Sequence, residues 1–272
     1  MKFKSFLLLP AILLSSCSKG NFILGLGGEN VPVGQYASKI LEYYEISEET
    51  LKNKGIISYG KDVKEVTTQV KEGLVSAGVI YKTDAYSAEL KIVDSATKEM
   101  CGQVLYPIAL IDNSVKDEQK ITAKYFLDYL TTDIAMAYFE GVGFKRQCEA
   151  RIPATSVSEN VEINVYVAAS LTESLTSIKN SFVTLNPNVT VNINFGSSGT
   201  LQTQIEEDKN KCDLFISAGA KQMNALEEKS LIIKESRFNI LENEVVLAVS
   251  DNNPANLGSF NDLANKLKEL IK

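Results

Sequence analysis

The chain has 272 residues, 44% of them hydrophobic and 23% charged, which is typical of a soluble globular protein of two lobes of roughly 100 to 150 residues each. Its net charge of −6 argues against nucleic acid as a partner, since nucleic-acid binders carry basic stripes. The sequence contains no His, the commonest general base and metal ligand, so most hydrolases and metalloenzymes are disfavoured. We expect no enzymatic activity, no cofactor and no direct ligand for a metal cation.

The N-terminal segment is predicted to be an export signal. Lys2 and Lys4 precede an apolar run of nine residues at 6–14, which is too short to span a bilayer core of about 30 Å. The run ends in Leu-Ser-Ser-Cys, which is similar to a bacterial lipobox. The similarity implies that residues 1–16 are cleaved and that Cys17 is lipidated, so the protein is expected to be membrane-anchored outside the cytoplasm, in the periplasm or on the outer face of the membrane. An ordinary signal peptide with an incidental Cys is the alternative.

Strand and helix patterns alternate through the first half of the chain. A helical apolar face runs through Val33, Ala37, Ile40, Leu41 and Tyr44. Short apolar strands are predicted at residues 22–27, 55–59, 77–81, 90–93 and 104–111. Two helices are predicted at about 117–130 and 132–140.

The same alternation restarts after a polar segment at about 145–160 that is predicted to be a linker. Strands are expected at residues 162–169, 190–195, 213–217 and 244–250. Helices are expected through Leu171 to Phe182, from about 199, from about 221 and over 260–271. Strands separated by crossover helices favour α/β lobes with parallel-rich sheets.

Three cysteines follow Cys17, namely Cys101, Cys148 and Cys212. An odd number leaves at least one free thiol, and the spacing matches no zinc pattern. A Cys148–Cys212 disulfide is left open.

Four predicted helix starts follow strands or turns, where free backbone N–H groups and a partial positive charge favour anions. Ser170 opens one helix, and Glu173 completes a capping-box pattern with it. Ser198 lies in a Gly-Ser-Ser-Gly turn whose small residues allow close backbone approach. Each of these residues taken alone is more often a plain cap or turn than a binding site.

The other two helix starts lie in the first half of the chain. Pro32 suits a first helical turn and exposes the N–H group of Val33, and Asp62 is a good N-cap that leaves Val63 at the turn's start. Tyr81 ends a strand, and its hydroxyl can donate one hydrogen bond.

Six segments together resemble the periplasmic molybdate-binding proteins, the solute receptors of molybdate ABC importers. They are VPVGQYA (31–37), GKDVKEV (60–66), GVIYKTDA (78–85), VAASLTESL (167–175), FGSSGTL (195–201) and CDLFISA (212–218). The resemblance implies a two-lobed, type II periplasmic-binding-protein fold that binds a tetrahedral oxyanion in its cleft. It implies oxyanion contacts from the hydroxyls and amides of Ser170 and Ser198, the amides of Val33 and Val63, and the Tyr81 hydroxyl. The chain departs from many relatives at Gly199, where they have Ser, and at Val33, where they have Ala.

The order of these segments is reversed relative to the family, as in a circular permutant. We therefore expect a discontinuous lobe from residues 17–103 and 247–272, which carries the VPVG, DV and VIYKTDA motifs. A continuous lobe from residues 104–246 would carry the AASLT and GSSG motifs and the linker.

The resulting hypothesis is a monomeric lipoprotein that captures molybdate or tungstate for an ABC permease. A receptor for sulfate, phosphate or another oxyanion is the alternative within this class. A sensory lipoprotein that feeds no importer, an enzyme, and a rearranged gene product that binds nothing are the rivals from other classes.

Overall fold

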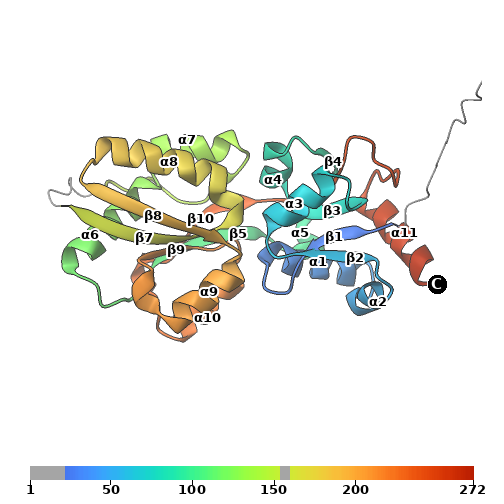
Figure 1. The fold of residues 1–272 in the computed structure, drawn as a ribbon, viewed down its shortest axis with the longest axis horizontal. Coiled ribbons are helices and arrows are strands. Elements are labelled where there is room, and N and C mark those ends of the chain that lie inside the picture. The colour runs from blue at the N-terminus through green and yellow to red at the C-terminus, as the bar shows by residue number, and fades with distance from the viewer. Residues whose placement is uncertain (1–21, 154–159) are drawn as a thin grey trace, which may run out of the picture.

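The computed structural model describes residues 22–153 and 160–272, which form two lobes side by side (Figure 1). The expected α/β two-lobed fold is confirmed, because each lobe is built on one β-sheet flanked by helices. Cys17 and the predicted signal lie outside the described residues. Within these residues, no helix combines the length and apolar character needed to cross a membrane.

The first lobe contains a five-stranded sheet in the order β2-β1-β3-β11-β4. Its strands are β1 (Leu24–Gly27), β2 (Ile57–Gly60), β3 (Ala77–Tyr81), β4 (Lys91–Ser95) and β11 (Val245–Val249). Strand β1 is parallel to β2 and β3, whereas β11 is antiparallel to β3 and β4. Its helices are α1 (Pro32–Tyr43), α2 (Glu48–Asn53), α3 (Val63–Lys71), α4 (Lys82–Ser87), α5 (Lys98–Cys101) and α11 (Phe260–Ile271).

The C-terminal helix α11 packs into this first lobe beside α2 (Figure 1). Its apolar face is buried at Phe260, Leu263 and Leu267, and the Phe260 amide donates to Asp94 Oδ2 at 2.8 Å. The first lobe therefore takes strands and helices from both ends of the described chain. The permuted order relative to the family remains a prediction from the sequence motifs.

The second lobe contains a six-stranded sheet in the order β6-β10-β5-β9-β7-β8. Its strands are β5 (Val104–Leu110), β6 (Lys145–Arg146), β7 (Val161–Ala168), β8 (Val189–Gly196), β9 (Leu214–Ile216) and β10 (Phe238–Asn243). The α-helices are α6 (Asp117–Tyr129), α7 (Asp133–Gly141), α8 (Thr172–Leu185), α9 (Ser198–Glu207) and α10 (Ala220–Glu228). Short 3₁₀ turns are η1 (Ala169–Leu171), η2 (Lys209–Lys211) and η3 (Lys234–Ser236). In Figure 1, α7 and α8 lie on one side of the sheet, and α9 and α10 on the other.

The chain crosses between the lobes from β4 to β5 and returns from β10 to β11. These crossings lie side by side, because β5 and β10 pair antiparallel with Asn243 opposite Val104. Glu244, between β10 and β11, accepts charged hydrogen bonds from Lys82 at 2.9 Å and Lys145 at 2.6 Å. The hinge is thus a short strand pair held by side chains from both lobes.

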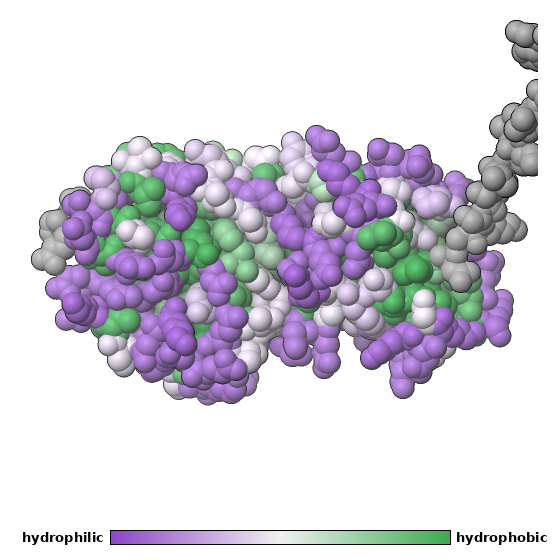
Figure 2. Space-filling view, in the orientation of Figure 1, coloured by the Kyte–Doolittle hydropathy of each residue, from purple (hydrophilic) through white to green (hydrophobic). Residues whose placement is uncertain are grey.

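A row of aromatic side chains continues from the first lobe into the second. Ring centroids are 6.4 Å apart for Tyr36–Tyr81, 5.9 Å for Tyr81–Tyr106, 5.3 Å for Tyr106–Phe144 and 6.1 Å for Phe139–Phe144, with the rings edge to face. Such edge-to-face pairs stabilise beyond the area they bury. The lobes therefore share buried aromatic contacts near the hinge. On the surface shown in Figure 2, hydrophilic side chains gather where the lobes meet.

Two details differ from the sequence-based expectations. Strand β10 was not predicted, and residues 145–160 begin with β6, whose Arg146 binds Asp133 and the carbonyl of Thr131. Cys101, Cys148 and Cys212 are free thiols, so the Cys148–Cys212 disulfide does not form.

Candidate functional site

A small cavity lies between the lobes, where helix starts from both lobes meet. It is lined by Val31, Pro32, Asp62, Val63, Tyr81, Ala168, Ala169, Ser170, Gly196, Ser197, Ser198 and Ala218. The centres of oxygen-sized atoms can range over about 10 Å³ of it. About 10–15 Å³ by this measure holds one water, so the cavity in this structure is small, and a sugar or peptide does not fit it.

Four of the five predicted oxyanion ligands line this cavity, and the fifth, Val33, follows the lining residue Pro32 in the chain. Val33 is the second residue of α1, which begins at Pro32 as expected, and its side chain is buried in the core. The amides of a first helical turn have no acceptor within their own helix. The backbone of Val33 therefore brings an N–H group to this helix start, although its side chain does not line the cavity.

The start of α3 is organised as the sequence predicts. Asp62 is the N-cap, and its carboxylate accepts from the Glu65 amide at 2.9 Å, while Glu65 Oε2 accepts from the Lys61 amide at 2.8 Å. These reciprocal bonds fix the first turn, and Val63 is its first residue.

Ser198 is the first residue of α9, after the N-cap Ser197, whose hydroxyl accepts from the Thr200 amide at 3.2 Å. The Ser198 oxygen accepts from the Ala218 amide at 3.0 Å. A hydroxyl has one hydrogen to donate, and no acceptor for that of Ser198 is found within residues 22–153 and 160–272. The Ala218 amide thus fixes the Ser198 hydroxyl at the cavity wall, and the hydroxyl hydrogen remains able to donate.

The expected capping box at Ser170 is wrong. Ser170 lies inside the 3₁₀ turn η1, and α8 begins two residues later with Leu171 as its cap residue and no side-chain cap bond. Glu173 instead binds Lys64 of the first lobe at 2.7 Å. The reason is that strand β7 enters its helix through a tighter turn, which moves the capping position past Ser170.

Ser170 is positioned by Tyr106 and Asn243, and no sequence motif singles out either residue. The hydroxyl oxygens of Ser170 and Tyr106 are 2.9 Å apart, and Asn243 Nδ2 donates to the Tyr106 oxygen at 3.2 Å. Burial raises the pKa of Tyr106 far above its ordinary value, so the phenol keeps its proton. Either hydroxyl can be the donor in the Ser170–Tyr106 hydrogen bond, which fixes the position of Ser170 at the cavity wall.

Tyr81 ends β3, and its hydroxyl donates to the Ala218 carbonyl of the opposite lobe at 3.2 Å. The side chain is fully buried, and burial raises the pKa of Tyr81 well above its ordinary value. In this geometry the Tyr81 hydroxyl forms a hydrogen bond between the two lobes. Ala218 therefore contacts two of the predicted residues, Ser198 through its amide and Tyr81 through its carbonyl.

An ion cluster around the buried Asp84 lies beside the cavity. Lys64 Nζ is 3.0 Å from Asp84 Oδ1 within the first lobe and 2.7 Å from Glu173 Oε2 of the second. Burial raises the pKa of Asp84 to about 7, although the nearby Lys64 lowers it. Burial lowers the pKa of Lys64, but Asp84 and Glu173 outweigh it and leave that pKa raised. Lys64 is thus engaged by acidic side chains of both lobes rather than available to an anion.

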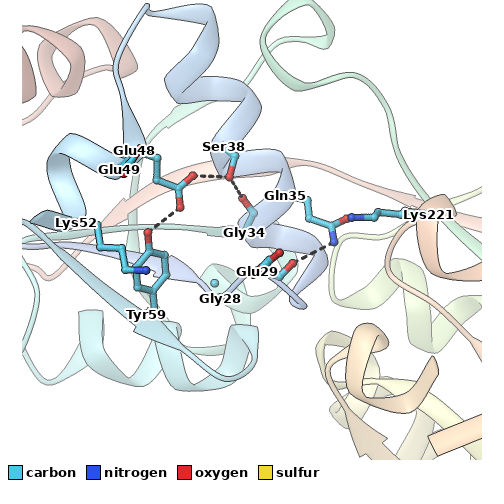
Figure 3. Close-up of a pocket in the computed structure, with 11 residues that line it drawn as sticks. Gly28, Glu29, Gly34, Gln35, Ser38, Glu48, Glu49, Lys52, Tyr59 and Lys221 are labelled. Carbon is cyan, nitrogen blue, oxygen red and sulfur yellow. Dashed lines mark hydrogen bonds between the residues drawn. The ribbon is translucent and has the colours of Figure 1, made fainter. Parts of the chain in front are cut away.

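A larger groove of about 630 Å³ lies outside this cavity, along α1, α2 and β2 (Figure 3). Its central carboxylate, Glu48, accepts from Ser38 at 2.6 Å and from Tyr59 at 2.8 Å. Glu29, Glu48 and Glu49 face only Lys52 and Lys221 among the groove's charged side chains. Size alone favours this groove, but its excess of carboxylates disfavours an anion, so the small cavity is the stronger candidate.

Metal binding by side chains has no support in the described part of the chain. No group of three or more His, Cys, Asp or Glu side chains there is arranged to hold a metal ion.

The sequence matches the family described as bacterial extracellular solute-binding protein over residues 18–145 and 163–271. The chain belongs to this family.

The chain is similar in sequence to two curated relatives. The chain is 38% identical over 117 residues to "Putative ABC transporter substrate-binding lipoprotein YvgL" of Bacillus subtilis, covering 43% of each chain. It is 36% identical over 92 residues to the molybdate-binding protein ModA of Haemophilus influenzae, covering 34% of this chain and 36% of that protein. The chain thus spans less than half the length of the curated relatives it matches.

A solved structure supports the fold across nearly the whole chain. The phosphate-binding protein of a phosphate ABC transporter from Streptococcus pneumoniae TIGR4 superposes with a TM-score of 0.54, covering 92% of this chain and 97% of that one. The two are 13% identical, so the likeness concerns the fold alone.

Replacing Asp84 should change how stability depends on pH. Its pKa is about 7 in the folded protein against an ordinary 3.8, so between these values the folded state holds the proton more tightly than the unfolded state. The free energy of unfolding therefore falls, through this group, as pH rises across that window. Asp84→Asn should lose this part of the decline, and urea unfolding at about pH 5 and about pH 8 measures it. The exposed Asp251→Asn is the control, and an equal decline in Asp84→Asn and wild type would contradict the assignment.

Proposed function

We propose that this solute-binding protein captures a tetrahedral oxyanion, molybdate or tungstate, outside the cytoplasm and delivers it to an ABC permease. The observation that carries the proposal is the convergence of neutral hydrogen-bond donors from both lobes on one compact cavity. Helix starts and hydroxyls surround it, and no Lys or Arg is among its lining residues.

Neutral donors suit a doubly charged ion that must be bound and released. Helix-start amides and hydroxyls stabilise an anion through partial charges and hydrogen bonds, without a permanent counter-ion. The one carboxylate in the lining, Asp62, is engaged with the Glu65 amide. Lys64 contacts acidic side chains of both lobes, so it forms an ion pair between the lobes and is not free to bind the ligand.

The choice of molybdate is supported by the motif resemblance and by the similarity to the molybdate-binding protein of Haemophilus influenzae. Molybdate and tungstate are close in size and charge, so the same donors should barely separate them. Sulfate is smaller, and a cavity closed around the larger ions should hold it less tightly.

Ligand binding is tested on the purified protein beginning after Cys17. Molybdate and tungstate should each bind, with sulfate and phosphate weaker, as measured by titration calorimetry. A ligand at 100 times its dissociation constant should stabilise the fold by about 2.7 kcal/mol in thermal melts. The absence of both heat and a melting shift with all four anions would reject oxyanion binding, whereas a preference for sulfate or phosphate would reject only the molybdate assignment.

The roles of the hydroxyls are tested by single substitutions. Ser170→Ala and Ser198→Ala should each weaken molybdate binding by about 1.5–3 kcal/mol, the contribution of a hydrogen bond to a charged group. Tyr81→Phe should cost less, about 0.5–1.5 kcal/mol, because its proton goes to the Ala218 carbonyl.

Ser174→Ala is the matched control for the serine variants. Like Ser170 and Ser198, Ser174 is buried, and it lies on α8. Its hydroxyl donates to the Leu171 carbonyl at 3.3 Å, and the residue does not line the cavity. Its molybdate affinity should equal that of wild type. Unchanged affinity in both Ser170→Ala and Ser198→Ala would move the site elsewhere.

We also propose that the protein is anchored through a lipid on Cys17. The support is the lipobox-like sequence and the lipoprotein named among the relatives. The wild-type protein should partition with membranes, and Cys17→Ser should release it or block its processing. Fractionation that finds the wild type wholly in the soluble extracytoplasmic fraction would rule the anchor out.

A further inference from the structure

A backbone hydrogen bond between the lobes joins the loop before α1 to the first turn of α9. The Gly199 amide donates to the Asn30 carbonyl at 3.1 Å. Asn30 lies two residues before Pro32, and Gly199 follows Ser198, so the contact borders the cavity wall on both sides. It is a hydrogen bond between a loop of the first lobe and a helix of the second.

Only a glycine fits at position 199 while the lobes are in this contact. A Cβ atom there would lie 2.3 Å from the Asn30 carbonyl oxygen, 2.9 Å from its Cβ and 3.0 Å from its carbonyl carbon. These distances are shorter than non-bonded atoms tolerate, and two of the three atoms are backbone. A side-chain rotation therefore cannot relieve the clash. The loop that carries Asn30 and the first turn of α9 must move apart.

The need for glycine at this position is not a matter of its own backbone conformation. The glycines with positive φ in the described chain are Gly55, Gly73, Gly102 and Gly143, and Gly199 is not among them. A residue with a side chain could adopt the Gly199 backbone without strain. The approach of the opposite lobe is what excludes it.

We propose that Gly199 sets how closely the two lobes can shut over the cavity, and thereby the size of oxyanion that the site holds tightly. The proposal rests on the oxyanion-binding function proposed above. The donors come from both lobes, with Val63 on one and Ser170 and Ser198 on the other. Separating the lobes by a fraction of an ångström lengthens every cross-cavity hydrogen bond at once, and such bonds weaken steeply with poor geometry.

The test compares Gly199→Ala and Gly199→Ser with Gly28→Ala. Gly28 lies on the facing loop, two residues from Asn30, and a Cβ there would meet only the Gly60 carbonyl oxygen at an ordinary 3.5 Å. Molybdate affinity should fall about ten-fold or more in both Gly199 variants and stay at the wild-type value in Gly28→Ala. Sulfate affinity should fall at least as much, since a smaller ion spans a widened cavity less well.

The ligand-free melting temperature should be nearly unchanged in the Gly199 variants, because open lobes relieve the clash. If a Gly199 variant fails to fold, amide hydrogen exchange of the wild type decides. The Gly199 amide should exchange more slowly with molybdate present, because closure supplies its acceptor, and an unchanged rate overturns the proposal.

The remaining outcomes separate this inference from the proposed function. Wild-type binding with unchanged affinity in Gly199→Ala overturns the role of Gly199 alone. An equal loss of molybdate affinity in Gly28→Ala overturns it as well. The loss would then follow from any methyl group added near this contact, whether or not it clashes with the opposite lobe. A wild type that binds no oxyanion overturns the proposed function and this inference with it.

Discussion

The amides of a helix's first turn have no acceptor within the helix, and the candidate site depends on where the fold places several such turns. Helices α1, α3 and α9 and the turn η1 all begin at the cavity between the lobes. Each follows a sheet strand, so the strands of both sheets deliver helix starts to the same junction. The site is therefore a property of two sheets facing each other, and neither lobe holds a complete set of donors.

The lobes meet through ion pairs, side-chain hydrogen bonds and a backbone hydrogen bond. Beside the cavity, Lys64 links a buried carboxylate of its own lobe to the half-exposed Glu173 of the other, and a pair this exposed contributes modestly. Across the cavity, Tyr81 donates to a carbonyl, and at its rim Gly199 donates to another. At the hinge, Asn243 binds Thr83 of the first lobe and Tyr106 of the second. The Tyr106–Ser170 hydrogen bond thus connects the hinge to the cavity wall.

The elements that the sequence predicted best are those with a long apolar face or a local cap. The helix beginning at Pro32, the cap at Asp62 and the strand ending at Tyr81 all occur as expected. Strand β10 was missed because its pairing partners, β5 and β6, are about 90 residues or more away in the sequence. The capping box at Ser170 failed because a 3₁₀ turn, which no sequence pattern distinguishes from a first helical turn, precedes α8.

By itself, the sequence determined the alternation of strands and helices, the helix starts and the segments that resemble an oxyanion receptor. These features rest on periodicity, caps and turn residues, which act within a few positions of the chain. Only the tertiary structure decided that Tyr106 holds Ser170, that Asp84 is buried beside Lys64, and that Gly199 touches Asn30. Those contacts join residues far apart in the chain, such as Lys64 and Glu173, which are 109 positions apart. Their energies depend on distances and burial that arise when the two sheets pack and the lobes come together, and no local pattern encodes them.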